Sequence, residues 1–325
     1  MDRRRLVLDT DPGIDDAVMI LYLAAEPAAE IVAVGSTHGN CSAEQAAANA
    51  LRVLDVCGLD NVPVAVGSES PLGETVWSAH VHGTDGLGDA GLGLDPPRRA
   101  PSGEPAVDQL LRLSREQPGE LDLLAVGSMT NLAQALERDP ASLRRFRSVS
   151  ILGGYSRPPR PGDPHTVDAN IYADSAGADR LFASGTPLTV IPIDLTNWVI
   201  LEDDHIARIR AGDTPQARFA WQILPFYFDF YQGVIGRWSA RMHDPLVAGV
   251  LLDPTLVRAT VERPMEVEPF ETKHRAVGRE DNGLAVGADR PPVHIVTEVA
   301  IRRFLDRLVD ALATPLGSLP SLPAS

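Results

Sequence analysis

Short apolar runs recur along the chain at the length of buried β-strands, and several are separated by segments with helical spacing. Six of these runs predict strands, at residues 6–8, 31–35, 62–66, 121–126, 149–152 and 188–193. Helical patterns cover residues 15–25, 43–56 and 132–137. Alternating strands and helices are typical of βα units. The pattern therefore predicts an α/β fold, a single domain with a mostly parallel, open, Rossmann-like central sheet flanked by helices.

Polar clusters follow five of the six predicted strands. They read DTDPGIDD after the first strand, STHGN after the second, GSMTN after the fourth, GGY after the fifth and DLTN after the sixth. Open α/β sheets bind ligands beyond the carboxyl ends of their strands. The sequence therefore predicts one active site at this edge of the sheet.

Three segments interrupt the alternation. They are a long loop at 67–104, a proline-rich stretch at 156–167, and a helical region at 203–250 that is rich in aromatic residues and includes a helix-like run at 225–241. Loops of this length in a compact domain are usually lids or functional insertions. We expect one domain over residues 1–312, followed by a disordered tail of proline and serine at 313–325.

Four aspartates surround the Pro12-Gly13 turn at the end of the first strand: Asp9, Asp11, Asp15 and Asp16. So many carboxylates within eight residues repel one another unless a cation neutralises them. Oxygen ligands without thiols or imidazoles favour Ca²⁺ over zinc. A pair of carboxylates at a helix start would explain Asp15 and Asp16 alone, through the helix dipole, but not the other two.

Composition narrows the classes of partner. The chain of 325 residues is 44% hydrophobic, enough for a full core, and its formal charge of −15 repels phosphate backbones, so we expect no nucleic-acid partner. Cys41 and Cys57 form no CxxC motif and are expected to be reduced thiols in a predicted helix. Neither a signal peptide nor an apolar run of membrane-spanning length is apparent, which predicts a cytoplasmic protein without a membrane partner.

Several other residues could carry chemistry. His243-Asp244 could supply a proton donor and a metal carboxylate, although such a pair taken alone is more often structural. Tyr227 and Tyr231 share one helical face, which suits core packing or a pocket for a flat ring. The sequence HVHGTDGLGD could offer zinc ligands, but its glycines favour a flexible loop near a site.

Asp168 and Asn170 stand at the end of the proline-rich stretch. In an extended segment, alternate side chains face the same way, so this pair could hydrogen-bond several hydroxyl groups of one ligand. An ordinary polar loop is the alternative, and the pair by itself does not exclude it.

Taken in order, the motifs resemble the nucleoside hydrolase family. They are DTDPGIDDA near the N-terminus, THGN at 37–40, HGTDGLGD at 82–89, GSMTNLA at 127–133, ILGGY at 151–155, DANI at 168–171, DLT at 194–196 and HDPL at 243–246. The resemblance implies an enzyme that uses Ca²⁺ and water to cleave the N-glycosidic bond of ribonucleosides, giving ribose and free base. It also implies a homodimer or homotetramer.

The resemblance assigns roles position by position. Asp11 would touch calcium and deprotonate the attacking water, and His243 would protonate the leaving base. The calcium ligands would be Asp11, Asp16, Asp244 and the backbone carbonyl of Val126. The ribose would be bound by Asp15, Asn40, Asp168 and Asn170, and the base by His82, Tyr227 and Tyr231. Asp9 would be structural.

The chain departs from the family pattern around the ribose. Asp168 stands where the family commonly has glutamate, and Ala169 replaces a more usual aromatic residue. The stretch 156–167 contains no asparagine to contact the 5′-hydroxyl. These changes leave metal binding intact but permit a modified or non-standard nucleoside.

Two other functional classes fit parts of the sequence. LVLDTD resembles the start of a haloacid dehalogenase-type phosphatase, with Asp9 as nucleophile, but Lys273 is the only lysine and lies far downstream. An EF-hand beginning at Asp9 fails because Ile20 replaces its terminal glutamate. A catalytically silent nucleoside or ribose binder of the same fold would share every motif.

Overall fold

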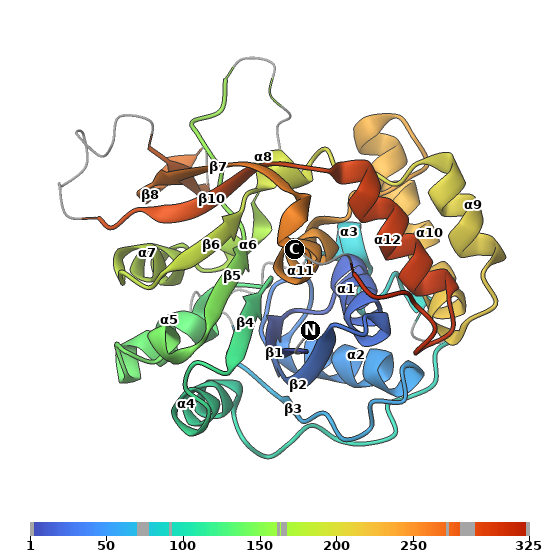
Figure 1. The fold of residues 1–325 in the computed structure, drawn as a ribbon, viewed down its shortest axis with the longest axis horizontal. Helices are drawn as coiled ribbons and strands as arrows, with labels where there is room; N and C mark the ends of the chain where they lie inside the picture. Colours follow the sequence, from blue (N-terminus) through green and yellow to red (C-terminus); the bar gives the residue numbers. More distant parts are fainter. Residues whose placement is uncertain are drawn as a thin grey trace.

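An eight-stranded sheet forms the centre of the computed structural model, which describes residues 3–69, 78–90, 93–160, 163, 168–270, 273–279 and 290–322 (Figure 1). The strand order is β3-β2-β1-β4-β5-β6-β10-β7, and the pairs are parallel except for β10 with β7. The strands are β1 (Arg4–Thr10), β2 (Ala29–Ser36), β3 (Val64–Ala65), β4 (Leu121–Ala125), β5 (Ser148–Leu152), β6 (Leu188–Ile191), β7 (Val257–Arg263) and β10 (Val293–Val299). The predicted single α/β domain is confirmed.

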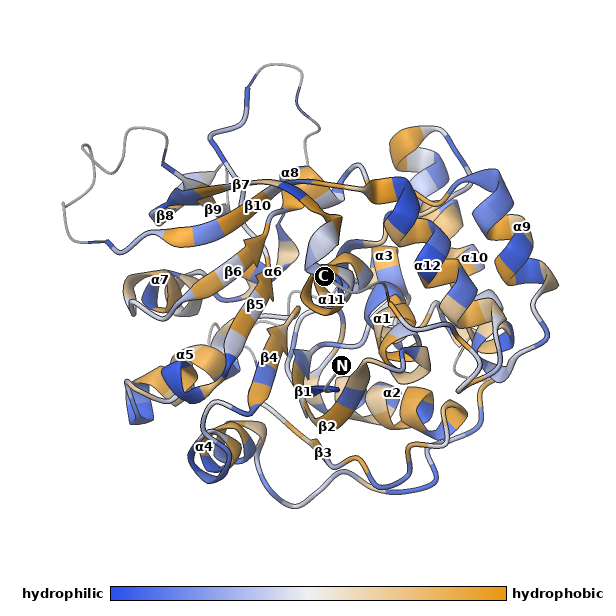
Figure 2. Cartoon of the chain, in the orientation of Figure 1, coloured by the Kyte–Doolittle hydropathy of each residue, from blue (hydrophilic) through white to orange (hydrophobic). Residues whose placement is uncertain are grey.

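Helices cover both faces of the sheet. One face packs against α4 (Ala106–Glu116), α5 (Thr130–Arg138) and α7 (Ser175–Ala183), and the other against α1 (Ile14–Ala25), α2 (Ala43–Val56), α11 (His243–Leu252) and α12 (Ile301–Ala313). Figure 2 shows hydrophobic residues concentrated on the strands and on the helix faces toward them. Burial on both faces explains why the strands read as continuous apolar runs.

The remaining helices form a layer beside the sheet and short pieces at its edge. The layer contains α9 (Asp203–Ala211) and α10 (Pro215–Ile235), which pack on each other and on α12. The short pieces are α3 (Ala79–His82), α6 (Ala169–Ala173) and α8 (Ile193–Thr196). No helix in the described part of the chain is long and apolar enough to cross a membrane.

All six predicted strands are present, but strands after residue 193 were missed. The edge strand β7 alternates exposed and half-buried residues, so it contains no continuous apolar run. The hairpin β8 (Met265–Phe270) and β9 (Lys273–Gly278) was also missed; it forms a separate two-stranded sheet.

The helix-like run expected at 225–241 is placed wrongly. Helix α10 begins ten residues earlier, at Pro215, continues through Pro225 and ends at Ile235. Gly236 then adopts the left-handed conformation (φ 72°), which terminates the helix. Residues 236–241 therefore leave the helix, and Arg241 forms an isolated antiparallel bridge with Ile200.

Three further expectations concern the two cysteines, the long loops and the C-terminal segment. Cys41 and Cys57 are buried free thiols, but they flank α2 and do not lie within it. The loop 67–104 contains α3, and its residues 70–77 and 91–92 lie outside the described residues, as do 161–162 and 164–167 of the proline-rich stretch. After α12 the chain packs back on the core through Leu319, which is 5% exposed, while residues 323–325 lie outside the description.

A buried carboxylate joins three strands at the amino ends of the sheet. Asp122 on β4 accepts hydrogen bonds from Arg4 of β1 (3.2 Å), from Arg147 beside β5 (2.9 Å to Nε) and from the Ser148 hydroxyl (2.7 Å). These donors hold the pKa of Asp122 below its ordinary value of 3.8, against the opposing effect of burial.

We expect Asp122→Asn to lower the free energy of unfolding at pH 7 by about 1–3 kcal/mol, since it removes charge-assisted hydrogen bonds. Because the folded pKa is depressed, the carboxylate stabilises the fold above pH 3.8 and loses this effect as pH falls further. Urea unfolding at pH 7 and pH 3 should therefore show a smaller difference between variant and parent at the lower pH. An equal difference at both would contradict this account.

Candidate active site

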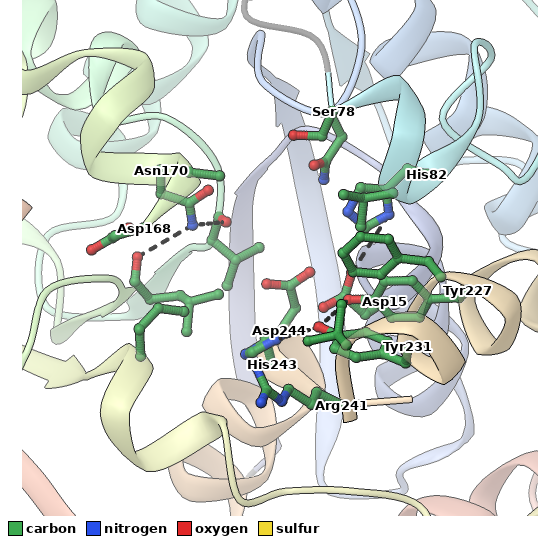
Figure 3. A pocket seen from close by; sticks show the side chains of 18 of the residues that line it. Asp15, Ser78, His82, Asp168, Asn170, Tyr227, Tyr231, Arg241, His243 and Asp244 are labelled. Carbon is green, nitrogen blue, oxygen red and sulfur yellow. Dashed lines mark hydrogen bonds and ion pairs between the residues drawn. The ribbon is translucent and has the colours of Figure 1, made fainter. Parts of the chain in front are cut away.

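The loops after parallel strands meet at one edge of the sheet, as predicted. Asp11 follows β1, Asn40 follows β2 and Val126 follows β4, while His243 and Asp244 begin α11. A cavity of about 330 Å³ lies here (Figure 3). Its lining comprises Asp15, Asn40, Ser78, His80, Val81, His82, Val126, Leu152, Asp168, Ala169, Asn170, Tyr172, Ile193, Tyr227, Phe230, Tyr231, Val234, Arg241, His243 and Asp244.

Ten of the predicted site residues line this cavity, and the other two are buried directly behind the lining. Asp11 and Asp16 are 1% and 0% exposed and are not part of the lining. Asp9 is also fully buried, and its carboxylate accepts a hydrogen bond from Asn131 (2.8 Å). Asp9 therefore supports the loop from below and lies too deep to act as a nucleophile.

Three carboxylates converge at the cavity. Oxygens of Asp15, Asp16 and Asp244 lie within 4.8 Å of one another. Burial raises the pKa of all three above the ordinary value; the mutual repulsion of Asp15 and Asp16 contributes to bring the pKa of Asp15 to about 8. Such a group favours either bound protons or a bound cation.

Asp16 is held by donors from strand β1, from the turn before α1 and from the loop after β2. It accepts hydrogen bonds from the Thr10 hydroxyl, from the Gly13 amide (3.0 Å) and from the Asn40 side chain (3.0 Å). The bond to Gly13 closes the first turn of α1, so Asp16 caps its own helix while facing the other carboxylates. Its position is set before any ligand binds.

Asp11 reaches its place because two neighbours lack side chains. Its Oδ2 accepts the Asn40 amide (2.8 Å), whereas its buried Oδ1 has no protein partner. A Cβ atom on Gly39 would lie 2.0 Å from Oδ2, and one on Gly127 would lie 2.8 Å from Oδ1. An unpartnered carboxylate oxygen in a buried site is costly, and a cation or a water would satisfy it.

The segment carrying Asp168 and Asn170 is helical, which corrects the extended arrangement expected from sequence. Asp168 caps α6, accepting the amides of Ile171 (3.2 Å) and Gly154. Asn170 donates from Nδ2 to the carbonyls of Val126 (2.5 Å) and Leu152 (3.3 Å). Because both bonds use Nδ2, the amide oxygen is left for a ligand.

Aromatic and imidazole rings form the opposite wall. The Tyr227 and Tyr231 hydroxyls of α10 lie 3.5 Å apart, and Tyr231 reaches His243 Nε2 (2.9 Å), whose Nδ1 contacts Thr196 (2.7 Å). The His82 ring lies 5.1 Å from that of Tyr227. This wall offers flat surfaces to a ring.

Both imidazoles are neutral at pH 7. Burial is the main cause that lowers the pKa of His82 and of His243 to about 3, with Arg241 adding to the effect at His243. The Ile14 amide donates to His82 Nδ1 (3.1 Å), which leaves the proton of His82 on Nε2.

The other possible metal groups are engaged elsewhere. The carboxylates of Asp85 and Asp89 accept hydrogen bonds within their own turn, from Leu87, Asp89 and Thr84. At the surface, Glu202 and Asp204 pair with Arg302 beside His205. Within the described residues, the buried carboxylate group is therefore the best-placed metal site.

Comparison with known proteins agrees with this geometry. Residues 6–306 match the family described as inosine-uridine preferring nucleoside hydrolase. The chain belongs to this family. Nucleoside hydrolases are N-glycosyl hydrolases, so the protein is an enzyme of that class.

Relatives cover nearly the whole chain. Uridine nucleosidase 1 of Arabidopsis thaliana is 34% identical over 92% of this chain and 83% of its own, and the inosine-uridine preferring nucleoside hydrolase of Leishmania major is 32% identical over 95% and 97%. The solved plant nucleoside hydrolase PpNRh1 superimposes with a TM-score of 0.86 at 29% identity, covering 96% of this chain and 99% of that one. The purine-preferring ribonucleoside hydrolase of Gardnerella vaginalis gives 0.84 at 28%, covering 95% and 98%.

Sequence reasoning missed several residues of this nucleoside hydrolase site. Thr196 lies in the DLT motif, whose position at a strand end could have indicated it. Asn131, which supports Asp9, lies similarly in GSMTN. Arg241 had no signal, because a single arginine outside any motif gives no pattern.

Proposed function

We propose that this nucleoside hydrolase cleaves ribonucleosides with water in a calcium-dependent reaction, releasing ribose and free base. The observation that carries the proposal is the composition of one cavity: Asp168 and Asn170 lie on one side and the aromatic and imidazole rings on the other, with the carboxylates of Asp15 and Asp244 beside the rings. A ribonucleoside has the matching halves, a hydroxyl-rich sugar and a flat base. The names of the relatives include uridine, inosine and purine nucleosides, so turnover on both purine and pyrimidine ribonucleosides will define the base preference.

Calcium would be held by Asp11, Asp16 and Asp244 together with the carbonyl of Val126, with Asp15 adjoining. The donors are all oxygens, as a hard cation prefers, and the unpartnered Asp11 Oδ1 gives a ready ligand atom. A bound ion would supply a positive charge that can bind ribose hydroxyls and lower the pKa of a water. Asp11 would accept the proton of the attacking water.

The sugar would lie between Asn40, Asp15, Asp168 and Asn170. Asn40 and Asp168 are fixed by hydrogen bonds to Asp16 and to backbone amides, and Asn170 directs its oxygen away from the carbonyls it binds. As the bond from C1′ to the base nitrogen stretches, positive charge develops on the ribose ring. The surrounding carboxylates stabilise that charge, as in glycoside hydrolysis.

His243 would protonate the departing base. Its low pKa keeps the imidazole neutral in the resting enzyme, but the negative charge that builds on the base favours the protonated form. Thr196 at Nδ1 and the Tyr231 hydroxyl at Nε2 fix the orientation of the ring. His82, Tyr227 and Tyr231 would support the plane of the base. A homodimer or homotetramer, which light scattering can establish, completes the proposal.

The first test is release of free base and ribose from inosine, adenosine, guanosine, uridine, cytidine and 2′-deoxyinosine, with calcium and after chelation. We expect calcium-dependent cleavage of at least one ribonucleoside. Asp11→Ala should lose about 10³-fold or more in kcat, because one carboxylate serves both metal and water. Binding of nucleoside without release of base from any substrate would instead identify a silent binding protein.

A second prediction concerns calcium and pH. A folded-state pKa of Asp15 near 8 means that the metal-free fold loses stability as pH rises from about 4 toward 8, since buried carboxyls must then ionise. Calcium should therefore raise the melting temperature more at pH 8 than at pH 6. At 100 times its dissociation constant, it should add about 2.7 kcal/mol.

Asp16→Asn is the matched variant for this measurement, because it removes one charge with little change in shape. After chelation its melting temperature should be higher than that of the parent, and added calcium should raise its melting temperature less. An undiminished calcium response in Asp16→Asn would remove this carboxylate from the metal site.

A third prediction separates the role of His243 from substrate binding. We expect His243→Ala to lose about 10²–10⁴-fold in kcat on inosine and uridine, as is typical for loss of a general acid. Cleavage of nitrophenyl riboside, whose leaving group needs no proton, should fall far less. Equal losses on both substrates would exclude His243 as the acid.

A further inference from the structure

One cation lies in the wall of the nucleoside cavity. Among the described residues that line it, Arg241 alone carries a permanent positive charge. Figure 3 shows its guanidinium group beside His243, on the side of the cavity away from Asp168 and Asn170. Arg241 therefore belongs to the part of the site that we assign to the base.

The guanidinium group is held in place before substrate binds. Nη1 donates to the Asn197 side-chain oxygen (2.6 Å), and Cζ lies 5.4 Å from the centroid of the Tyr231 ring. The backbone of Arg241 is anchored by its bridge to Ile200, and the residue is 7% exposed. A rigid cation in a site shielded from water acts on nearby charge far more strongly than an exposed one.

The nearby imidazoles are neutral and leave one N–H donor, at His82 Nε2, without a hydrogen-bond partner among the described residues. His243 contacts Thr196 and Tyr231 through its two nitrogens, and His82 accepts the Ile14 amide at Nδ1. A guanidinium group presents up to five N–H donors and accepts no hydrogen bond. It therefore pairs with oxo groups and unprotonated ring nitrogens and opposes amino groups.

The reaction produces charge that such a group can stabilise. When the C1′–N bond breaks, its electron pair stays on the base nitrogen, and the water oxygen forms the new bond to C1′. One proton of the water passes to Asp11 and from there to solvent, while His243 delivers a proton taken up from solvent to the base, which leaves as the neutral product. Until that transfer is complete, oxo-substituted bases spread the negative charge onto their exocyclic oxygens.

We propose that Arg241 binds the oxo edge of the base and stabilises the negative charge that develops there, so that the enzyme selects oxo-substituted over amino-substituted bases. The proposal rests on the hydrolase function for its kinetic part and on the cavity alone for its binding part. A solely structural arginine would brace Asn197 and Tyr231 and would affect all bases equally.

Binding of free bases tests the selection without turnover. Barbiturate is a flat oxo-pyrimidine that is anionic at neutral pH, uracil is its neutral counterpart, and cytosine carries an amino group. We expect calorimetry on the calcium-loaded enzyme to rank barbiturate over uracil over cytosine. Arg241→Met should lower the affinity for barbiturate by about 10- to 100-fold, the range for a charge-assisted hydrogen bond. The affinity for cytosine should stay nearly unchanged.

Two further variants separate charge from folding. Arg241→Lys keeps the charge and should retain part of the barbiturate preference. Arg237→Met removes a nearby exposed arginine that pairs with Asp203 outside the cavity, and should behave as the parent. Circular dichroism and the melting temperature of each variant verify folding.

The ratio of kcat/KM between two substrates of the same variant provides a second test. In Arg241→Met, kcat/KM for uridine relative to cytidine, and for inosine relative to adenosine, should fall by about 10-fold or more. Equal losses for all bases, or a parent that binds barbiturate no better than cytosine, would overturn the role of Arg241. Binding that follows the predicted order in a protein that releases no base would overturn the hydrolase function instead.

Discussion

The crowding of carboxylates around the start of α1 is the constraint on which the rest of the site depends. Asp15 and Asp16 occupy the first turn of a helix, Asp11 lies in the preceding loop, and Asp244 arrives from a helix more than two hundred residues away. Burial opposes ionisation of all four. The fold tolerates the arrangement because amides and hydroxyls position the oxygens, and the cation that we propose would supply the missing charge.

Much of this edge of the molecule was predictable from sequence. Buried parallel strands can be recognised in a sequence as apolar runs, and the loops that follow them share one edge of the sheet. This rule placed Asp11 and Asn40 at that edge, and the resemblance to nucleoside hydrolases supplied the Val126 carbonyl and the role of each residue. His243 and Asp244 could be singled out as a possible acid and metal ligand, but only that resemblance linked them to the aspartates, because pattern alone cannot pair distant segments.

The failures share a physical cause, which is that local pattern does not reveal tertiary context. Strand β7 has one open face and so lacks an apolar run. Helix α10 passes through Pro225 because packing outweighs the missing hydrogen bond, and it stops at Gly236, whose conformation only the structure reveals. Arg241 lies at the cavity because Asn197 and Tyr231, which are not adjacent to it in sequence, hold it there, and the sequence does not reveal these contacts.

The carboxylates and the tyrosines of the cavity belong to different layers of the protein. Asp15 and Asp16 begin α1 and Asp244 begins α11, both packed on the central sheet, whereas the tyrosines project from α10, which packs beside the sheet against α1, α9 and α12. Substitutions in the outer layer can therefore reshape the recognition of the base without disturbing the metal ligands. The metal site can therefore stay the same while the residues that bind the base change, in keeping with relatives whose names give different nucleosides.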